Sequence, residues 1–189
     1  MNRLISVAVV SALLALPAVG EASIFQFNTL LSGANEVPSN SLGGTGFGAL
    51  AYNDNNTLTT TDDFYNFSLS VFGLSGAATG MHIHAPAAIG ANGPIIIPLT
   101  TPNFLVLSSG NSVLIGGTNV APPSSLFLGQ LQSGLAYVNL HTALNPGGEI
   151  RGQLLPVVAA VPEPTTSAMF LAGIGLLGWM ARRKAQAHR

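Results

Sequence analysis

Three histidines are the residues of this chain whose spacing best suits the binding of a metal ion. His82 and His84 are separated by one residue, and His141 lies in the later stretch 137–142. Residues two apart in a β-strand point to the same face, so His82 and His84 can present two imidazoles to one ion. One interpretation is a three-histidine site for zinc or copper, with Glu149 as a further ligand or as the group that orients one. In the alternative interpretation these imidazoles hydrogen-bond backbone and turn groups and hold loops in place.

His141 and Glu149 belong to two stretches that we expect to form a hairpin. Polar and apolar side chains alternate along residues 137–142 and again along residues 149–154, with turn residues between them. If the register keeps the apolar side chains together, His141 and Glu149 share a face near the turn. A slip of one residue reverses every side chain, so the sequence leaves open whether the two residues lie opposite each other.

Arg151 lies two residues from Glu149 on the same expected strand face, and two interpretations of this pair are open. The two side chains form a ligand-recognition pair, or they satisfy each other or nearby backbone carbonyls. The sequence shows no Ser-His-Asp order, no phosphate-binding loop and no paired carboxylate motif. We therefore expect a protein that is not an enzyme.

The elements that must position these residues are short strands, because short apolar runs are separated by clusters of Gly, Pro and Asn. The pattern predicts an all-β fold, an antiparallel sandwich or barrel. One short helix is expected around 125–133, after two prolines and capped by Ser124 or Ser125. The expected strands cover residues 24–31, 47–53, 57–61, 64–72, 80–85, 95–99, 104–107, 112–115, 135–142 and 149–155.

The amino end has the pattern of a cleavable secretory signal peptide over residues 1–22. Arg3 supplies a positive charge, Leu4–Leu16 is apolar, and Pro17 and small residues follow. Cleavage after Gly20 or after Ala22 satisfies the small-residue rule, and Ala22 is preferred here. We expect a signal helix that directs the chain to the export machinery and signal peptidase.

The carboxyl end, residues 161–189, has the order of a membrane-directed tail. An apolar stretch without charges covers residues 165–181, at the lower edge of the length that spans a bilayer. Basic residues after such a segment favour the cytoplasmic side, so the preceding chain is expected to lie outside. The turn before the stretch and the basic stop after it consist of Pro162, Glu163, Pro164, Arg182, Arg183 and Lys184.

This tail resembles the PEP-CTERM sorting signal of Gram-negative bacteria, in which a Pro-Glu-Pro motif, a transmembrane helix and a basic cluster are read by a membrane protease called exosortase. The resemblance implies transient insertion in the inner membrane and processing near residues 162–164. Release or attachment at the cell surface follows, with exopolysaccharide or surface proteins as possible partners. A permanent single-span anchor is the alternative.

Between the two ends, residues 23–160 have the length of one domain and few charges. Arg151 is the one Lys or Arg there, and with its carboxylates the segment has a formal charge of −4, the acidic residues being Glu36, Asp54, Asp62, Asp63 and Glu149. Nucleic-acid binding needs clustered cations, so we exclude that class of partner. The chain has no cysteine, so its stability must come from the core or from a metal.

Three motifs in residues 25–155 together resemble the CHRD domain, named from the animal protein chordin and common in bacterial exported proteins. In order they are LSGANEVP at 31–38, MHIHAPA at 81–87 with GANGP at 90–94, and YVNLHT at 137–142 with GGEIRGQL at 147–154. The resemblance implies an immunoglobulin-like or superoxide-dismutase-like antiparallel β fold and no established reaction.

The resemblance leaves two functional hypotheses. The first is a non-enzymatic exported β domain with a binding or structural role at the cell surface or in the extracellular matrix, for example of a biofilm. The second is a mononuclear copper or zinc protein distantly similar to superoxide dismutases. The dinuclear site of that family takes six histidines and an aspartate, whereas residues 23–160 contain three histidines. We therefore expect no dismutase activity.

Overall fold

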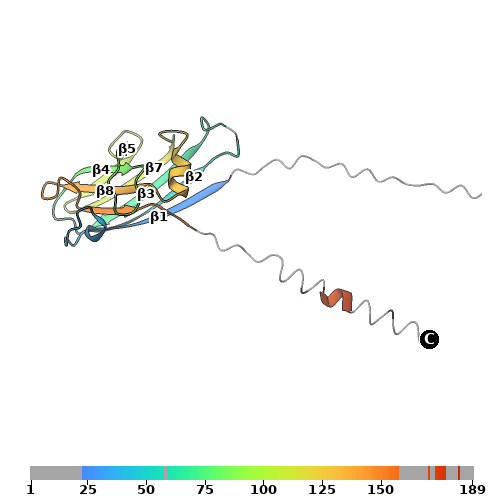
Figure 1. Cartoon of the computed structure of the whole chain (residues 1–189). Helices are drawn as coiled ribbons and strands as arrows, with labels where there is room; N and C mark the ends of the chain where they lie inside the picture. Colours follow the sequence, from blue (N-terminus) through green and yellow to red (C-terminus); the bar gives the residue numbers. More distant parts are fainter. Residues whose placement is uncertain (1–22, 58, 158–169, 171–172, 178–182, 184–189) are drawn as a thin grey trace, which may run out of the picture. The chain divides into compact units, whose positions relative to one another are not determined.

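A computed structural model describes residues 23–57, 59–157, 170, 173–177 and 183 (Figure 1). The chain forms two compact units, Met1–Val157 and Val158–Arg189, and each is described by itself. The predicted signal helix of residues 1–22 lies outside the described residues. Within 165–181, the described residues 170 and 173–177 are helical, and no helix of the described residues is long and apolar enough to cross a membrane.

The first unit is built on one antiparallel sheet of ten strands, which confirms the all-β prediction. The sheet curls into a half-barrel (Figure 1). Its strands follow the order β5-β4-β8-β9-β1-β2-β3-β7-β6, with β10 beside β1. The strands are β1 Ile24–Ser32, β2 Thr45–Asn53, β3 Phe64–Phe72, β4 Ala78–His84, β5 Ile95–Pro98, β6 Leu105–Ser109, β7 Ser112–Val120, β8 Tyr137–Thr142, β9 Ile150–Gln153 and β10 Leu155–Pro156.

Alternation of apolar and polar side chains places the core on one face of this sheet. In β3, Tyr65, Phe67, Leu69 and Val71 are buried, and β2 pairs with β3 without a register shift along all nine residues. The same period of two buries Met81 and other apolar residues of the second half of the sheet. Each strand therefore has a core face and an outer face.

The expected strand at residues 57–61 is wrong, because none of its described residues is in a strand and they follow a turn at Asn55 and Asn56. Threonine favours strands, but here the side chains bind the local backbone and one another. The backbone N–H groups of Asn55 and Asn56 donate to the side chains of Asn53 and Asp54, at 2.8 and 2.9 Å. Both asparagines have positive φ, at 46° and 52°, which asparagine tolerates better than most residues.

Two helical turns complete the first unit. The 3₁₀ helix η1 Gly33–Asn35 follows β1, and α1 Phe127–Gln132 confirms the helix expected around 125–133. The expected side-chain cap from a serine is absent, since the helix begins after Leu126 without a side-chain cap. Phe127 is fully buried, with its ring centroid 5.6 Å from that of Tyr65, so α1 covers the core.

The buried hydroxyl of Tyr52 gives a prediction for stability. It donates to Oδ2 of Asp63 at 2.6 Å, and both residues are buried. Tyr52→Phe should lower the free energy of unfolding by about 1.5–3 kcal/mol, because a buried carboxylate loses its donor. Urea denaturation measures the change. Tyr65→Phe is the matched control, since Tyr65 is the register partner of Tyr52. Equal stability of Tyr52→Phe and the wild type would contradict the prediction.

Candidate metal centre

Strands β4 and β8 bring the three histidines together on the outer face of the sheet. Met81 and Ile83 point to the core, so His82 and His84 point away from it. β8 pairs with β4 such that His141 lies opposite Gly80. A Cβ atom on Gly80 would lie 3.1 Å from Cε1 of His82 and 3.4 Å from Cδ2 of His141, so glycine leaves the space in which these rings meet.

The three imidazoles are close enough to share one ion. The ring centroids of His82 and His84 are 5.8 Å apart, and those of His82 and His141 are 5.1 Å apart. One ligand nitrogen of each of the three histidines lies within 4.8 Å of the other two. Zinc–nitrogen bonds in a tetrahedral site place their nitrogens about 3.3 Å apart, so ring rotations that close the widest gap by about 1.5 Å would complete the geometry.

Hydrogen bonds to backbone carbonyls decide which nitrogen of two histidines is free. Nδ1 of His84 lies 2.8 Å from the carbonyl oxygen of Gly93, and Nδ1 of His141 lies 3.0 Å from that of Pro146. A carbonyl oxygen only accepts, so both Nδ1 atoms carry the proton and both Nε2 atoms carry a lone pair. Metal-binding histidines are oriented by this kind of contact.

The free nitrogens are buried and have no hydrogen-bond partner among the described residues. They are Nε2 of His84, Nε2 of His141 and Nδ1 of His82. Unpartnered buried polar atoms are costly, and none of these three nitrogens has a hydrogen-bond partner among the described residues. A cation between them would satisfy all three at once. Three neutral nitrogen ligands fit zinc or copper.

Burial favours the neutral, metal-binding form of two imidazoles. Desolvation lowers the pKa of His82, and the nearby His141 and His84 lower it further. Desolvation also lowers the pKa of His84 more than the hydrogen bond to Gly93 raises it, with His141 and Arg151 adding to the decrease. Both residues therefore present lone pairs at neutral pH, where a protonated histidine could not bind a metal.

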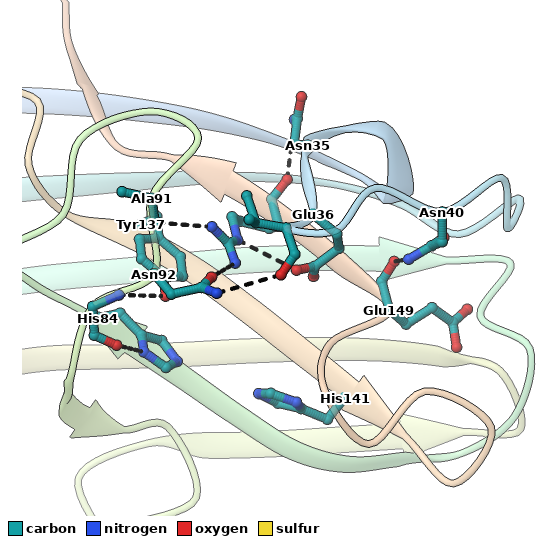
Figure 2. Close-up of polar contacts among 12 residues, drawn as sticks. Asn35, Glu36, Asn40, His84, Ala91, Asn92, Tyr137, His141 and Glu149 are labelled. Carbon is teal, nitrogen blue, oxygen red and sulfur yellow. Dashed lines mark hydrogen bonds and ion pairs between the residues drawn. The ribbon is translucent and has the colours of Figure 1, made fainter.

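Glu149 is not brought to the histidines. Its buried carboxylate accepts hydrogen bonds from the backbone N–H of Ser75 at 2.6 Å, from the Ser75 hydroxyl and from the Thr142 hydroxyl at 2.6 Å. The backbone N–H of Glu149 donates to the carbonyl of Leu140, whose register partner is already Ile150. Two consecutive residues thus face Leu140, and the alternation that would place Glu149 beside His141 is broken. In Figure 2 the Glu149 side chain points away from His141 and His84.

Arg151 pairs with a carboxylate other than the expected one. Its Nε lies 3.3 Å from Oε2 of Glu36, and both side chains are buried. The expectation of a backbone partner is met at the carbonyl of Ala91, to which Nη1 donates at 3.0 Å. The guanidinium carbon also lies 4.3 Å from the ring centroid of Tyr137. Sequence reasoning missed this role of Glu36, although the residue belongs to the first motif that resembles a CHRD domain.

Two known families match this sequence, and the first match lies within the residues of the sheet. The sequence matches the CHRD domain over residues 27–154, which is more than half of the chain. The chain belongs to the CHRD family. Residues 160–184 match the PEP-CTERM protein-sorting motif. No curated protein and no solved structure matches the chain. Both resemblances noted in the sequence are confirmed, and the CHRD match contains all three histidines.

The PEP-CTERM match gives the CHRD protein a sorting route. The motif implies export, membrane-anchored sorting and processing by an exosortase-like membrane protease. Of the residues predicted to form this signal, Arg183 is helical and exposed. The others, namely Pro162, Glu163, Pro164, Arg182 and Lys184, lie outside the described residues.

The lowered pKa values of His82 and His84 predict how the metal-free protein responds to acid. Unfolded histidines take up protons near their ordinary pKa of 6.5, whereas the folded domain keeps these two neutral to lower pH. The unfolded state therefore binds more protons just below pH 6.5, so stability falls as the pH decreases from 6.5 to the folded pKa values. Thermal unfolding in the presence of a chelator, at several pH values across this window, measures the effect.

The control for this pH dependence is a double variant, His82→Gln with His84→Gln. Glutamine does not titrate, so the melting temperature of the double variant should depend less on pH across the same window than that of the wild type. An identical pH dependence in the variant and the wild type would contradict the assignment to these two residues.

Proposed function

We propose that this CHRD protein is an exported, non-enzymatic metal-binding protein, whose domain holds one copper or zinc ion through His82, His84 and His141. The observation that carries the proposal is the proximity of the three imidazoles, of which one ligand nitrogen each lies within 4.8 Å of the others, while each ring also has a buried nitrogen without a hydrogen-bond partner among the described residues. Structural histidines would use both nitrogens for hydrogen bonds or leave one in water. Here two rings are fixed by backbone carbonyls and direct their second nitrogen, which is buried, into the group.

The ligand set favours copper and zinc over harder cations. Imidazole nitrogen suits both metals, whereas magnesium and calcium prefer oxygen ligands. The carboxylate nearest in sequence, that of Glu149, is engaged by Ser75 and Thr142. At such a site the affinity for Cu²⁺ is expected to exceed that for Zn²⁺, following the general order for divalent metals. The ion would link β4 to β8 and stabilise the sheet of a domain without disulfides.

We infer a binding role rather than catalysis from the number of histidines and from the catalytic motifs that the sequence lacks. A dismutase-like dinuclear centre needs more histidines than the three of the exported part. We also found no nucleophile motif and no pair of carboxylates suited to acid–base chemistry. The metal would then act in storage, in delivery or in cross-linking the sheet.

The place of action that we propose is the cell surface or the extracellular matrix, reached through the exosortase route. A surface partner, such as another exported protein or exopolysaccharide, is supported by an apolar row on the outer face of the sheet. Register places these side chains next to one another across five strands, in the order Leu30, Phe47, Ser70, Leu114 and Leu107. The four apolar members are between 47% and 76% exposed. Exposed rows of this kind often mark interaction sites.

Metal content measures the first part of the proposal. The protein is purified without a histidine tag, incubated with Cu²⁺ or Zn²⁺ and freed of excess metal. Elemental mass spectrometry then measures the metal content per chain. We expect about one ion per chain in the wild type and almost none in a variant with His82, His84 and His141 replaced by alanine. His188→Ala is the matched control and should bind like the wild type. Equal metal content in the triple variant would end the proposal.

Fractionation measures the sorting route. The full chain and a chain ending at Ala160 are produced in a bacterium that has an exosortase. We expect the full chain to leave the cytoplasm and to lose the tail that begins near Pro162. The shortened chain should be exported without passing through a membrane-bound stage. Retention of both proteins in the cytoplasm would contradict the route while leaving the metal site untouched.

A further inference from the structure

We infer that Arg151 is a positioning residue for the metal ligand His84, an inference that rests on the proposed metal-binding function. Arg151 is 4% exposed and contacts four groups from distant parts of the chain. Nε pairs with Glu36 at 3.3 Å, Nη1 donates to the carbonyl of Ala91 at 3.0 Å, and Nη2 donates to Oδ1 of Asn92 at 2.5 Å. Its fourth contact is the ring of Tyr137, 4.3 Å away.

Two separate routes lead from these contacts to His84. The first runs through the loop between β4 and β5, because Arg151 holds Ala91 and Asn92, and the carbonyl of the next residue, Gly93, accepts from Nδ1 of His84. This hydrogen bond fixes both the tautomer and the rotation of the ring. Figure 2 shows Ala91, Asn92 and Tyr137 grouped beside His84.

The second route runs through Tyr137. Its ring is stacked on His84, with centroids 4.6 Å apart and planes 6° from parallel, and the guanidinium contacts the same tyrosine ring. The Tyr137 hydroxyl accepts from the backbone N–H of Gly93 at 3.2 Å, which ties the two routes together. Stacking on the Tyr137 ring therefore fixes the plane of the His84 imidazole, and the hydrogen bond to Gly93 in the loop fixes its rotation. Both constraints depend on the same guanidinium.

The other two metal ligands lie outside this arrangement. His141 is oriented by the carbonyl of Pro146, in the turn after β8, and Nδ1 of His82 has no hydrogen-bond partner among the described residues. A change at Arg151 should therefore weaken one ligand of three and leave the ion bound by the remaining two. Loss of a contact that orients a ligand typically lowers metal affinity about 10–100-fold.

The chemistry of the guanidinium explains why arginine is needed here. A planar group with donors on three nitrogens can pair with a carboxylate, bind two loop oxygens and lie against an aromatic ring at once. Lysine keeps the charge but offers a single ammonium without the fork. Glu36 matches the buried charge, so the positive charge of Arg151 does not stand alone beside a metal cation. Arg151→Lys is therefore the variant that separates geometry from charge.

The test compares dissociation constants for Cu²⁺ and Zn²⁺, measured by competition with a chelator on the full chain. Arg151→Lys should weaken binding about 10–100-fold while the stoichiometry stays at one ion. The paramagnetic resonance spectrum of bound Cu²⁺ should also change, because one nitrogen ligand is displaced or rotated. Glu149→Gln is the matched control, since it alters a buried charge of the same hairpin away from Arg151, and it should leave the dissociation constant unchanged.

A double variant separates positioning from a general loss of stability. If Arg151 acts through His84, Arg151→Lys should have almost no further effect on metal affinity in a His84→Ala background. An equal loss in both backgrounds would overturn the inference, as would wild-type affinity in Arg151→Lys. Asn92→Ala, at an exposed position of the loop, gives a second variant if Arg151→Lys does not fold, and it should weaken binding in the same direction. Wild-type affinity there would overturn the loop route.

The same dissociation constants distinguish a failure of the proposed metal site from a failure of the positioning role of Arg151. If the wild type and His84→Ala bind Cu²⁺ and Zn²⁺ equally, the histidine site itself is wrong, and the inference about Arg151 falls with it. If the wild type binds one ion that His84→Ala binds far more weakly, and only the Arg151 and Asn92 variants match the wild type, the metal site stands and the positioning role is rejected.

Discussion

The contact between Arg151 and Glu36 is the one on which the arrangement of the histidine-bearing half of the sheet depends. Arg151 is the one Lys or Arg in the stretch 23–157, and it is buried. A buried charge is tolerated only when it is paired and hydrogen-bonded, so the surrounding segments must supply its partners. The segment after η1 supplies Glu36, and the loop between β4 and β5 supplies its oxygens. One side chain thereby joins segments that no strand pairing joins.

Much of the fold could be predicted from the local alternation of apolar and polar residues in the sequence. Strand β3 covers the predicted residues 64–72, because alternation depends on neighbours two positions away and needs no knowledge of the rest of the chain. The same rule correctly put His82 and His84 on one face. That His141 joins them follows from the register of β8 on β4, which aligns residues about sixty positions apart in the chain.

Other features could not be predicted, because they depend on contacts between distant residues or on a break in the local pattern. Whether Glu149 lies opposite His141 was left open by the sequence; in the structure the residue precedes β9 and its carboxylate accepts hydrogen bonds from Ser75, 74 positions away. Glu149 or nearby backbone carbonyls were expected as partners of Arg151, but its carboxylate partner is Glu36. Glu36 follows Asn35, whose side chain donates to the Arg151 carbonyl across 116 positions. Threonine-rich residues 57–61 were misread because asparagine and aspartate side chains satisfy the turn locally.

Gly80 is needed for the space that it leaves beside the histidines of the proposed metal site and not for the conformation of the backbone. Its backbone does not need glycine for conformational reasons, since its φ is not among the positive values, and its absent side chain leaves the histidine rings room to meet. A larger residue there would crowd the rings of both His82 and His141, because its Cβ atom would lie 3.1 Å from Cε1 of His82 and 3.4 Å from Cδ2 of His141. The need for glycine at this position therefore comes from the two imidazoles and not from the backbone of the strand.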